Sequence, residues 1–204
     1  MIFIRLLTTT IFILSSVELA FAQEEYLYRG QSGVGASVDY ASNDITVAYG
    51  GSLGFSYKGI FDINFSFATL ENRLNGYSWV SGHSMSPSFT FYLAKQESGG
   101  KQPTIGLSCA YLFNSEEFWT MKPGPNNAVS VGILFAHQIL HSDNVILQPM
   151  FGVSFVKGPA FAVVSIASIA VGGRFEGGQV LTLTPTVSFQ SPSVVYGGSF
   201  VFVL

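Results

Sequence analysis

Val194-Val-Tyr-Gly-Gly-Ser-Phe-Val-Phe-Val-Leu204 is the stretch of sequence that decides the fold. Successive side chains of a β-strand point to opposite faces, so this stretch has one bulky apolar face and one face of small or β-branched residues. The bulky face consists of Val194, Tyr196, Gly198, Phe200, Phe202 and Leu204. A strand this long and apolar would be an aggregation-prone edge in a soluble sheet. The pattern therefore predicts a strand that pairs with the first strand to close a barrel and turns its aromatic face to lipid.

The same alternation runs through the rest of the chain and predicts an all-β, up-and-down antiparallel transmembrane barrel of about ten strands. The clearest part is a hairpin in which residues 45–57 and 61–68 alternate around a two-residue turn, Lys58-Gly59. The other strands are predicted at 33–40, 84–93, 105–113, 129–135, 145–155, 160–175, 181–189 and 194–204. Eight strands are the alternative, if the first or the eighth segment is not a strand.

Two segments break the alternation. Residues 71–82 and 114–127 are predicted loops, and the second contains Phe118 and Trp119, which we expect at a membrane boundary. Within 160–175 the apolar residues change parity, which predicts a β-bulge near Ala167. An even number of strands places both ends of the mature barrel on the periplasmic side and these two loops on the outside.

Composition agrees with this class of protein. The chain has 204 residues, of which 48% are hydrophobic and only 10% are charged, whereas ordinary soluble domains have about 25% charged residues. After the N-terminus no apolar run reaches the roughly 20 residues that a membrane helix needs. The net charge of -3 argues against nucleic-acid binding, which needs a basic surface.

The first 22 residues read as a secretory signal peptide. Arg5 provides a positive start, residues 6–14 are apolar, and Ala20-Phe-Ala22 is a small-x-small cleavage site. We therefore expect Sec export, cleavage after Ala22, and a single barrel domain over residues 23–204. A short N-terminal membrane anchor is the alternative.

The bulky face is assigned to lipid for two reasons. It holds more aromatic volume than the interior of a small barrel readily accepts, and the opposite face of Gly, Ser, Thr and Ala is nearly uncharged. Aromatic residues near the predicted strand ends fit the girdles of membrane barrels; they are Tyr40, Tyr57, Phe61, Tyr77, Trp79, Phe113 and Phe175. The alternative is a secreted lipocalin-like barrel, in which the apolar face would point inward.

The sequence contains no convincing catalytic or metal-binding pattern. His83, His137 and His141 lack metal-ligand spacing, and lone Cys109 falls on the apolar face. Some outer-membrane lipid A deacylases place His and Ser two residues apart on one strand, whereas the residue two after His83 is Met85. We expect neither enzymatic activity nor a cofactor, with a lipid-modifying hydrolase as the minor alternative.

A few polar side chains fall on the inward face: Asp39, Asp62, Asn64, Gln148 and Arg174. Charges inside a barrel are costly unless they are paired or hydrated. These residues therefore form either a structural network or a constriction for a solute. Because Asp62 and Arg174 lie near turns at the same barrel end, we predict that they pair.

The C-terminal strand resembles the assembly signal of bacterial outer-membrane β-barrels. In that family the last residue is usually aromatic, with further apolar residues at alternate positions; Tyr196, Phe200 and Phe202 fit, and Leu204 stands where Phe is usual. In pattern, the mature chain resembles small barrels such as the transmembrane domain of outer membrane protein A and the X- and W-type proteins. The resemblance implies residence in a bacterial outer membrane, with bilayer lipid, lipopolysaccharide and the barrel-assembly machinery as partners.

Two functions are compatible with this class. The first is a structural or surface-interaction role without a large pore. The second is a narrow channel or carrier for small or apolar solutes. Neither the solute nor a surface partner follows from the sequence.

Overall fold

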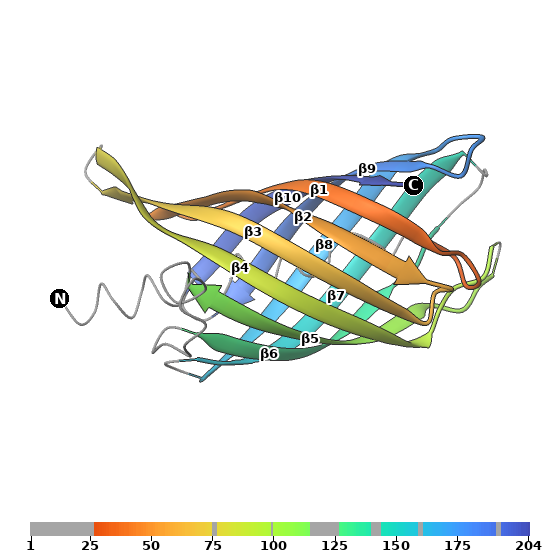
Figure 1. The fold of residues 1–204 in the computed structure, drawn as a ribbon, viewed down its shortest axis with the longest axis horizontal. Coiled ribbons are helices and arrows are strands. Elements are labelled where there is room, and N and C mark those ends of the chain that lie inside the picture. Colours follow the sequence, from red (N-terminus) through yellow and green to blue (C-terminus); the bar gives the residue numbers. More distant parts are fainter. Residues whose placement is uncertain are drawn as a thin grey trace.

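The computed structural model describes residues 27–74, 77–98, 100–114, 127–139, 144–158, 161–190 and 193–204. Ten strands form one closed antiparallel barrel in which each strand pairs with its neighbours in the chain (Figure 1). The strands are β1 (Gly33–Ser42), β2 (Thr46–Tyr57), β3 (Phe61–Leu74), β4 (Tyr77–Ala94), β5 (Thr104–Asn114), β6 (Ala128–Ala136), β7 (Val145–Lys157), β8 (Phe161–Arg174), β9 (Val180–Gln190) and β10 (Ser193–Val203). The predicted all-β up-and-down barrel is confirmed, and so is the number of ten strands. The predicted signal peptide, the residues 115–126 with Phe118 and Trp119, and His141 lie outside the described residues.

The C-terminal strand closes the barrel, as its alternating pattern predicts. β10 pairs with β1 from Gly35 opposite Val203 to Ser42 opposite Tyr196. Two backbone bonds extend the seam, from Val34 N–H to the Leu204 carbonyl (3.1 Å) and from Leu204 N–H to the Val34 carbonyl (2.8 Å). The seam leaves neither β1 nor β10 as a free edge.

The predicted turn at Lys58-Gly59 is also confirmed. Both residues have positive φ, 50° and 61°, which matches the type I′ turn that suits the twist of a two-residue hairpin. Ile60 N–H closes the turn on the Tyr57 carbonyl at 2.8 Å. We call this barrel end the turn end, because the short connections after β2, β4 and β8 lie there together with Leu204. The opposite end is the loop end.

The prediction of a loop at 71–82 is wrong. β3 and β4 continue as a paired ribbon, from Glu71 opposite Val80 to Leu74 opposite Tyr77, after a register shift next to Leu70. The shift inserts an extra residue in β4 and so breaks the alternation on which the prediction relied. This hairpin projects beyond the other strands at the loop end (Figure 1).

The prediction of a β-bulge near Ala167 is wrong as well. β8 pairs with β7 in unbroken register from Val145 opposite Gly173 to Lys157 opposite Phe161. Val164 and Ile166 therefore point inward, while Ile169 and Val171 point outward. The apparent change of parity arises because this part of the interior is lined by aliphatic side chains.

Within the described part of the chain, no helix is long and apolar enough to cross a membrane.

Candidate functional site

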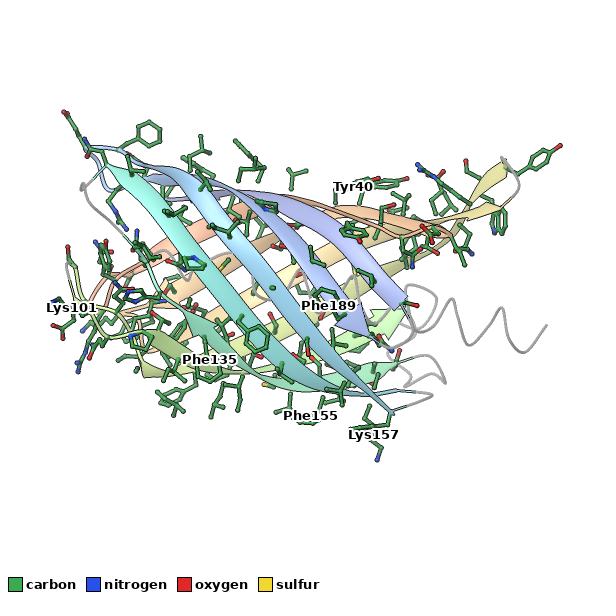
Figure 2. All side chains as sticks on the ribbon, turned by 180° about the vertical axis from the view of Figure 1, so that it is seen from behind. Tyr40, Lys101, Phe135, Phe155, Lys157 and Phe189 are labelled. Atoms are coloured by element: carbon green, nitrogen blue, oxygen red, sulfur yellow. The ribbon has the colours of Figure 1, made fainter. Side chains whose placement is uncertain are left out.

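The outer face of the barrel is apolar in every strand. Val38 on β1, Leu53 on β2 and Phe161 on β8 are each about two-thirds exposed (69%, 66% and 67%). On β1–β4 the residues that alternate with this outer face are buried and mainly polar, such as Ser56 and Ser66, whereas on β8 they are mainly aliphatic, such as Val164. Figure 2 shows Phe135, Phe155 and Phe189 along the outside of the barrel, with Lys101 and Lys157 at its two ends. This arrangement is the reverse of the lipocalin-like alternative, which places the apolar face inside.

Aromatic residues mark the ends of the outer face. Tyr40, Tyr57, Tyr77, Trp79 and Phe175 are exposed there, as predicted, and Phe61 and Phe113 are partly exposed. Tyr57 stacks on Phe61 with ring centroids 5.5 Å apart. The predicted assembly residues of β10 also face outward; these are Tyr196, Phe200, Phe202 and Leu204.

The interior surface has two different halves. We call the inward residues of β1–β4 the polar half. Its centre is a cross-strand row of four serines, in which Ser37 faces Ser52, Ser52 faces Ser66, and Ser66 faces Ser86. The Ser37 and Ser52 hydroxyl oxygens are 2.9 Å apart. We call the inward residues of β6–β8 the aliphatic half, which contains Leu134, Ile146, Met150, Val156, Val164 and Ile166.

Asp39 lies next to the serine row in the polar half, and only 4% of its surface is exposed. The Ser37 hydroxyl donates to Asp39 Oδ2 at 2.6 Å, and Ser199 of β10 provides a second side-chain hydrogen bond. Oδ1 finds no partner, and no cation of the described chain is within ion-pair distance of this carboxylate. Gly50 faces Asp39 across the β1–β2 pair, so no side chain of β2 covers the carboxylate from that position.

Gly50 lies within β2, not in a turn, and the close backbone of the neighbouring strand requires a glycine at this position. An added Cβ would collide with the Phe67 carbonyl oxygen on β3. Close approach of β2 and β3 at this position leaves room only for hydrogen. The glycine therefore keeps both the strand pairing and the space beside Asp39.

Asp62 belongs to a second cluster at the turn end. The Tyr92 hydroxyl donates a short hydrogen bond to Asp62 Oδ2. Lys95 Nζ lies 3.7 Å from the centroid of the Tyr92 ring, within the range of a cation–π contact. Asp62 is 7% exposed and Lys95 is 4% exposed, so the acid and the base are both buried and joined through one tyrosine.

Arg174 does not pair with Asp62, so this prediction is wrong. Its guanidinium lies 4.9 Å from the centroid of the Tyr28 ring. The ion pairs among the described residues are Arg29–Glu97 at 3.4 Å and Arg73–Glu71 at 3.9 Å. Strands β3 and β8 lie on opposite walls of the ten-stranded ring, and each charged residue contacts an aromatic residue close to it instead.

The turn end is tied together by a network that we call the turn-end cap, made of residues 27–32, Lys58, Gln96 and Gln138. Arg29 N–H donates to the Gln96 carbonyl (3.0 Å) and Gly30 N–H to the Lys58 carbonyl (2.9 Å). Gln96 also bonds through both ends of its amide to the Gln138 backbone, at 2.8 and 3.0 Å. Residues 27–32 thus contact both the β2–β3 turn and the connection after β4 at the turn end.

The remaining predicted interior residues are inward but scattered. Asn64 is 6% exposed in the polar half, and Gln148 is 2% exposed among aliphatic residues of β7.

The histidines and the cysteine form no site among the described residues. His83 points outward, where its ring stacks on Phe67 with centroids 6.0 Å apart and lies 3.0 Å from the Thr69 hydroxyl. His137 follows β6, and Cys109 is exposed on the outer face. Among the described residues, no group of three or more His, Cys, Asp or Glu side chains could hold a metal ion.

Sequence reasoning missed Lys95, Gln96 and Gln138, because polar residues in a predicted turn read as solvated. Tyr92 did carry a signal, since it is an aromatic residue at an inward position where its neighbours are Ser88 and Thr90. An isolated large polar side chain on a face of small residues indicates a specific partner nearby, here Asp62 on the adjacent strand β3.

No known protein family matches the chain, and no curated protein matches it in sequence. Among solved structures, the chain is similar to the beta domain of the Bordetella autotransporter BrkA, with a TM-score of 0.47, 8% identity, and coverage of 84% of this chain and 98% of that one. It is also similar to a loop-deletion mutant of OmpT, an outer membrane protein of Vibrio cholerae, with a TM-score of 0.37, 12% identity, and coverage of 82% and 61%. The transport unit of the autotransporter AIDA-I from Escherichia coli gives a TM-score of 0.37 and 8% identity, with 96% of each chain covered.

Proposed function

We propose that this protein is an integral β-barrel of a bacterial outer membrane, with a structural or surface-interaction role and without a wide pore. One observation carries the proposal: large apolar side chains cover the outside of all ten strands, while Ser, Thr, Asp and Asn face the interior of β1–β4. Water is a poor solvent for such an outer face, and a contiguous exposed apolar surface of this kind marks a membrane or protein contact. A closed barrel satisfies every strand hydrogen bond internally, as lipid requires.

The dimensions agree with a bilayer. A tilted membrane strand needs about 9–11 residues to cross the hydrocarbon layer. The strands have between 9 residues, in β6, and 18 residues, in β4. Lys101 and Lys157, at opposite ends of the barrel in Figure 2, lie where headgroups and water would meet it. Lipid and lipopolysaccharide would surround the apolar face, and the aromatic face of β10 would serve recognition by the assembly machinery.

A wide pore is disfavoured by the strand number and by the aliphatic half of the interior. Barrels of about eight strands are filled by side chains, and water-filled porins have about 16–18 strands.

The structural or surface role also has a candidate location in the β3–β4 hairpin, which projects at the loop end and on which Tyr77 is 77% exposed. We assign the protein no enzymatic activity. His83 contacts the Phe67 ring and the Thr69 hydroxyl, and among the described residues no carboxylate pairs with its ring to orient it as a catalytic base.

The native cysteine provides the test. Cys109 lies in the middle of β5, between Phe89 and Val131 on the neighbouring strands, and points outward. In membrane fragments open on both sides, a membrane-impermeant maleimide should leave Cys109 unmodified, and denaturation in urea should make it reactive. The matched control is Lys101→Cys in a Cys109→Ser background, which should react without denaturation because Lys101 is exposed at the turn end. Rapid labelling of Cys109 in the folded protein, or recovery of the protein in the soluble fraction, would refute membrane insertion.

A further inference from the structure

We propose that the polar half of the interior is a narrow path for small cations, and that Asp39 gives this path its preference for positive charge. The inference rests on the proposed membrane insertion, since a path across the barrel has a function only if the barrel spans a bilayer. It specifies which wall the solute follows and which charge the solute carries.

The interior is divided lengthwise, and one half holds most of the polar groups that can solvate an ion, although Gln148 and Ser154 on β7 add two to the other half. In the order of the ring, β2 lies opposite β7 and β3 lies opposite β8. The β2 and β3 wall presents Ser52, Ser56, Asp62, Asn64 and Ser66, whereas the opposite wall presents mainly Ile146, Met150, Val156, Val164 and Ile166. Aliphatic groups cannot replace the hydration shell of an ion, and hydroxyl oxygens can. A permeating cation would therefore follow β1–β4.

Hydroxyl groups along this wall have unused hydrogen-bonding capacity. The hydroxyl oxygens of Ser56, Ser66 and Ser86 find no partner within the protein, and none of these serines is more than 2% exposed. Buried polar atoms are nearly always hydrogen-bonded. Ser66 and Ser86 face each other across β3 and β4, and Ser56 lies nearer the turn end on β2, opposite Asp62. These unsatisfied oxygens on three neighbouring strands indicate positions where water or a solute would supply the missing hydrogen bonds.

The distribution of charge sets the sign of the solute. The inward-facing charged side chains of the described residues are Asp39, Asp62, Lys95 and Arg174. Lys95 and Arg174 both lie at the turn end, and Lys95 is coupled to Asp62 through Tyr92. Asp39 lies farther inside, where its hydrogen bonds come from neutral serines and its Oδ1 is unsatisfied. An isolated carboxylate on a polar pore wall attracts cations and repels anions, as acidic rings do in cation channels.

The test is ion selectivity of the full mature chain in planar bilayers under a KCl gradient. The wild type should conduct in small steps and pass potassium in preference to chloride. Asp39→Asn should lower the potassium-to-chloride permeability ratio by about thirtyfold, because one unit charge acting at ~4 Å through water favours potassium about sixfold and disfavours chloride by the same factor. Asp44→Asn is the matched control. Asp44 is exposed in the turn between β1 and β2 at the loop end, and screening at about 1 M salt should make its removal ineffective.

A second variant keeps the proposal testable if Asp39→Asn assembles poorly. In a Cys109→Ser background, Asp39→Cys can be inserted first and then modified with thiol reagents. A negatively charged reagent should restore cation preference, and a positively charged reagent should abolish it. Protection of Cys109 from maleimide reports insertion independently of conductance, so failure of the membrane proposal and failure of this inference give different results. An inserted wild-type barrel that does not conduct, prefers chloride, or keeps its ratio in Asp39→Asn would overturn the inference.

Discussion

Replacing Phe65 with Arg should strongly destabilise the barrel, because it puts a charge in the middle of the outer face. Phe65 lies four residues after Phe61, where β3 begins at the turn end, and it pairs with Leu53 and Pro87 on the adjacent strands. At about 3.3 Å per residue and a tilt of about 40°, each residue advances about 2.5 Å along the axis, which places Phe65 about 10 Å from the turn end. That depth is close to the midplane of an apolar band about 25 Å tall.

An Arg at the midplane costs about 2–4 kcal/mol, and the cost falls to about 0–1 kcal/mol near the interface. Tyr77→Arg is the matched control, because Tyr77 is 77% exposed on the projecting hairpin. Phe65→Ala separates loss of the ring from gain of the charge. The assay is reversible folding into lipid vesicles in urea, followed by the difference in gel mobility between folded and heat-denatured protein. Equal free-energy losses for Phe65→Arg and Tyr77→Arg would refute the assignment of this face to lipid.

Two further predictions concern the interior. Gly50→Ala should lower the yield of folded barrel, because the new methyl group would collide with the Phe67 carbonyl. Gly152→Ala is the control and should be tolerated, since the heavy atom nearest to its new methyl group would be an ordinary 3.5 Å away. The gel mobility of unheated samples measures the folded yield of both variants. Tyr92→Phe should reduce the free energy of unfolding by about 1–3 kcal/mol, because the buried Asp62 loses its donor. Tyr111→Phe provides a comparison in a partly exposed tyrosine, whose hydroxyl accepts from Asn127 at 3.1 Å, and an equal loss there would contradict the special role of Tyr92.

The sequence predicted the fold where alternation was unbroken. Between Leu53 and Phe67 every strand residue of β2 and β3 faces inward or outward as predicted. The reason is that one tight turn joins the two strands and their pairing register is unbroken. The prediction failed at residues 71–82 because a single inserted residue reverses the parity, so a paired ribbon looks like a loop. It failed near Ala167 for the opposite reason, since aliphatic residues on both faces of β8 look like a bulge.

The candidate site was predicted only in part. Alternation alone places Asp39 and Asp62 inside the barrel, and both are there. Their partners depend on neighbours brought together by closure, such as Ser199 for Asp39, and on the connection after β4 that brings Lys95 over Tyr92. No local pattern encodes such contacts, which explains why the Asp62–Arg174 pair was wrong and the turn-end cap was missed. Signal cleavage, Sec export and the surface partners stay predictions.

The seam between β1 and β10 has a consequence for the kinetics of assembly. Nine of the ten strand pairings join consecutive strands and can form locally, whereas the seam joins residues from opposite ends of the barrel sequence. Contacts of such large sequence separation carry the greatest loop-closure entropy and form slowly. Until the seam forms, β1 and β10 each present a row of unpaired backbone groups, which hydrocarbon does not tolerate. Closure and insertion are therefore expected to be one concerted step, and a change that weakens only the seam should slow insertion rather than trap a half-inserted sheet.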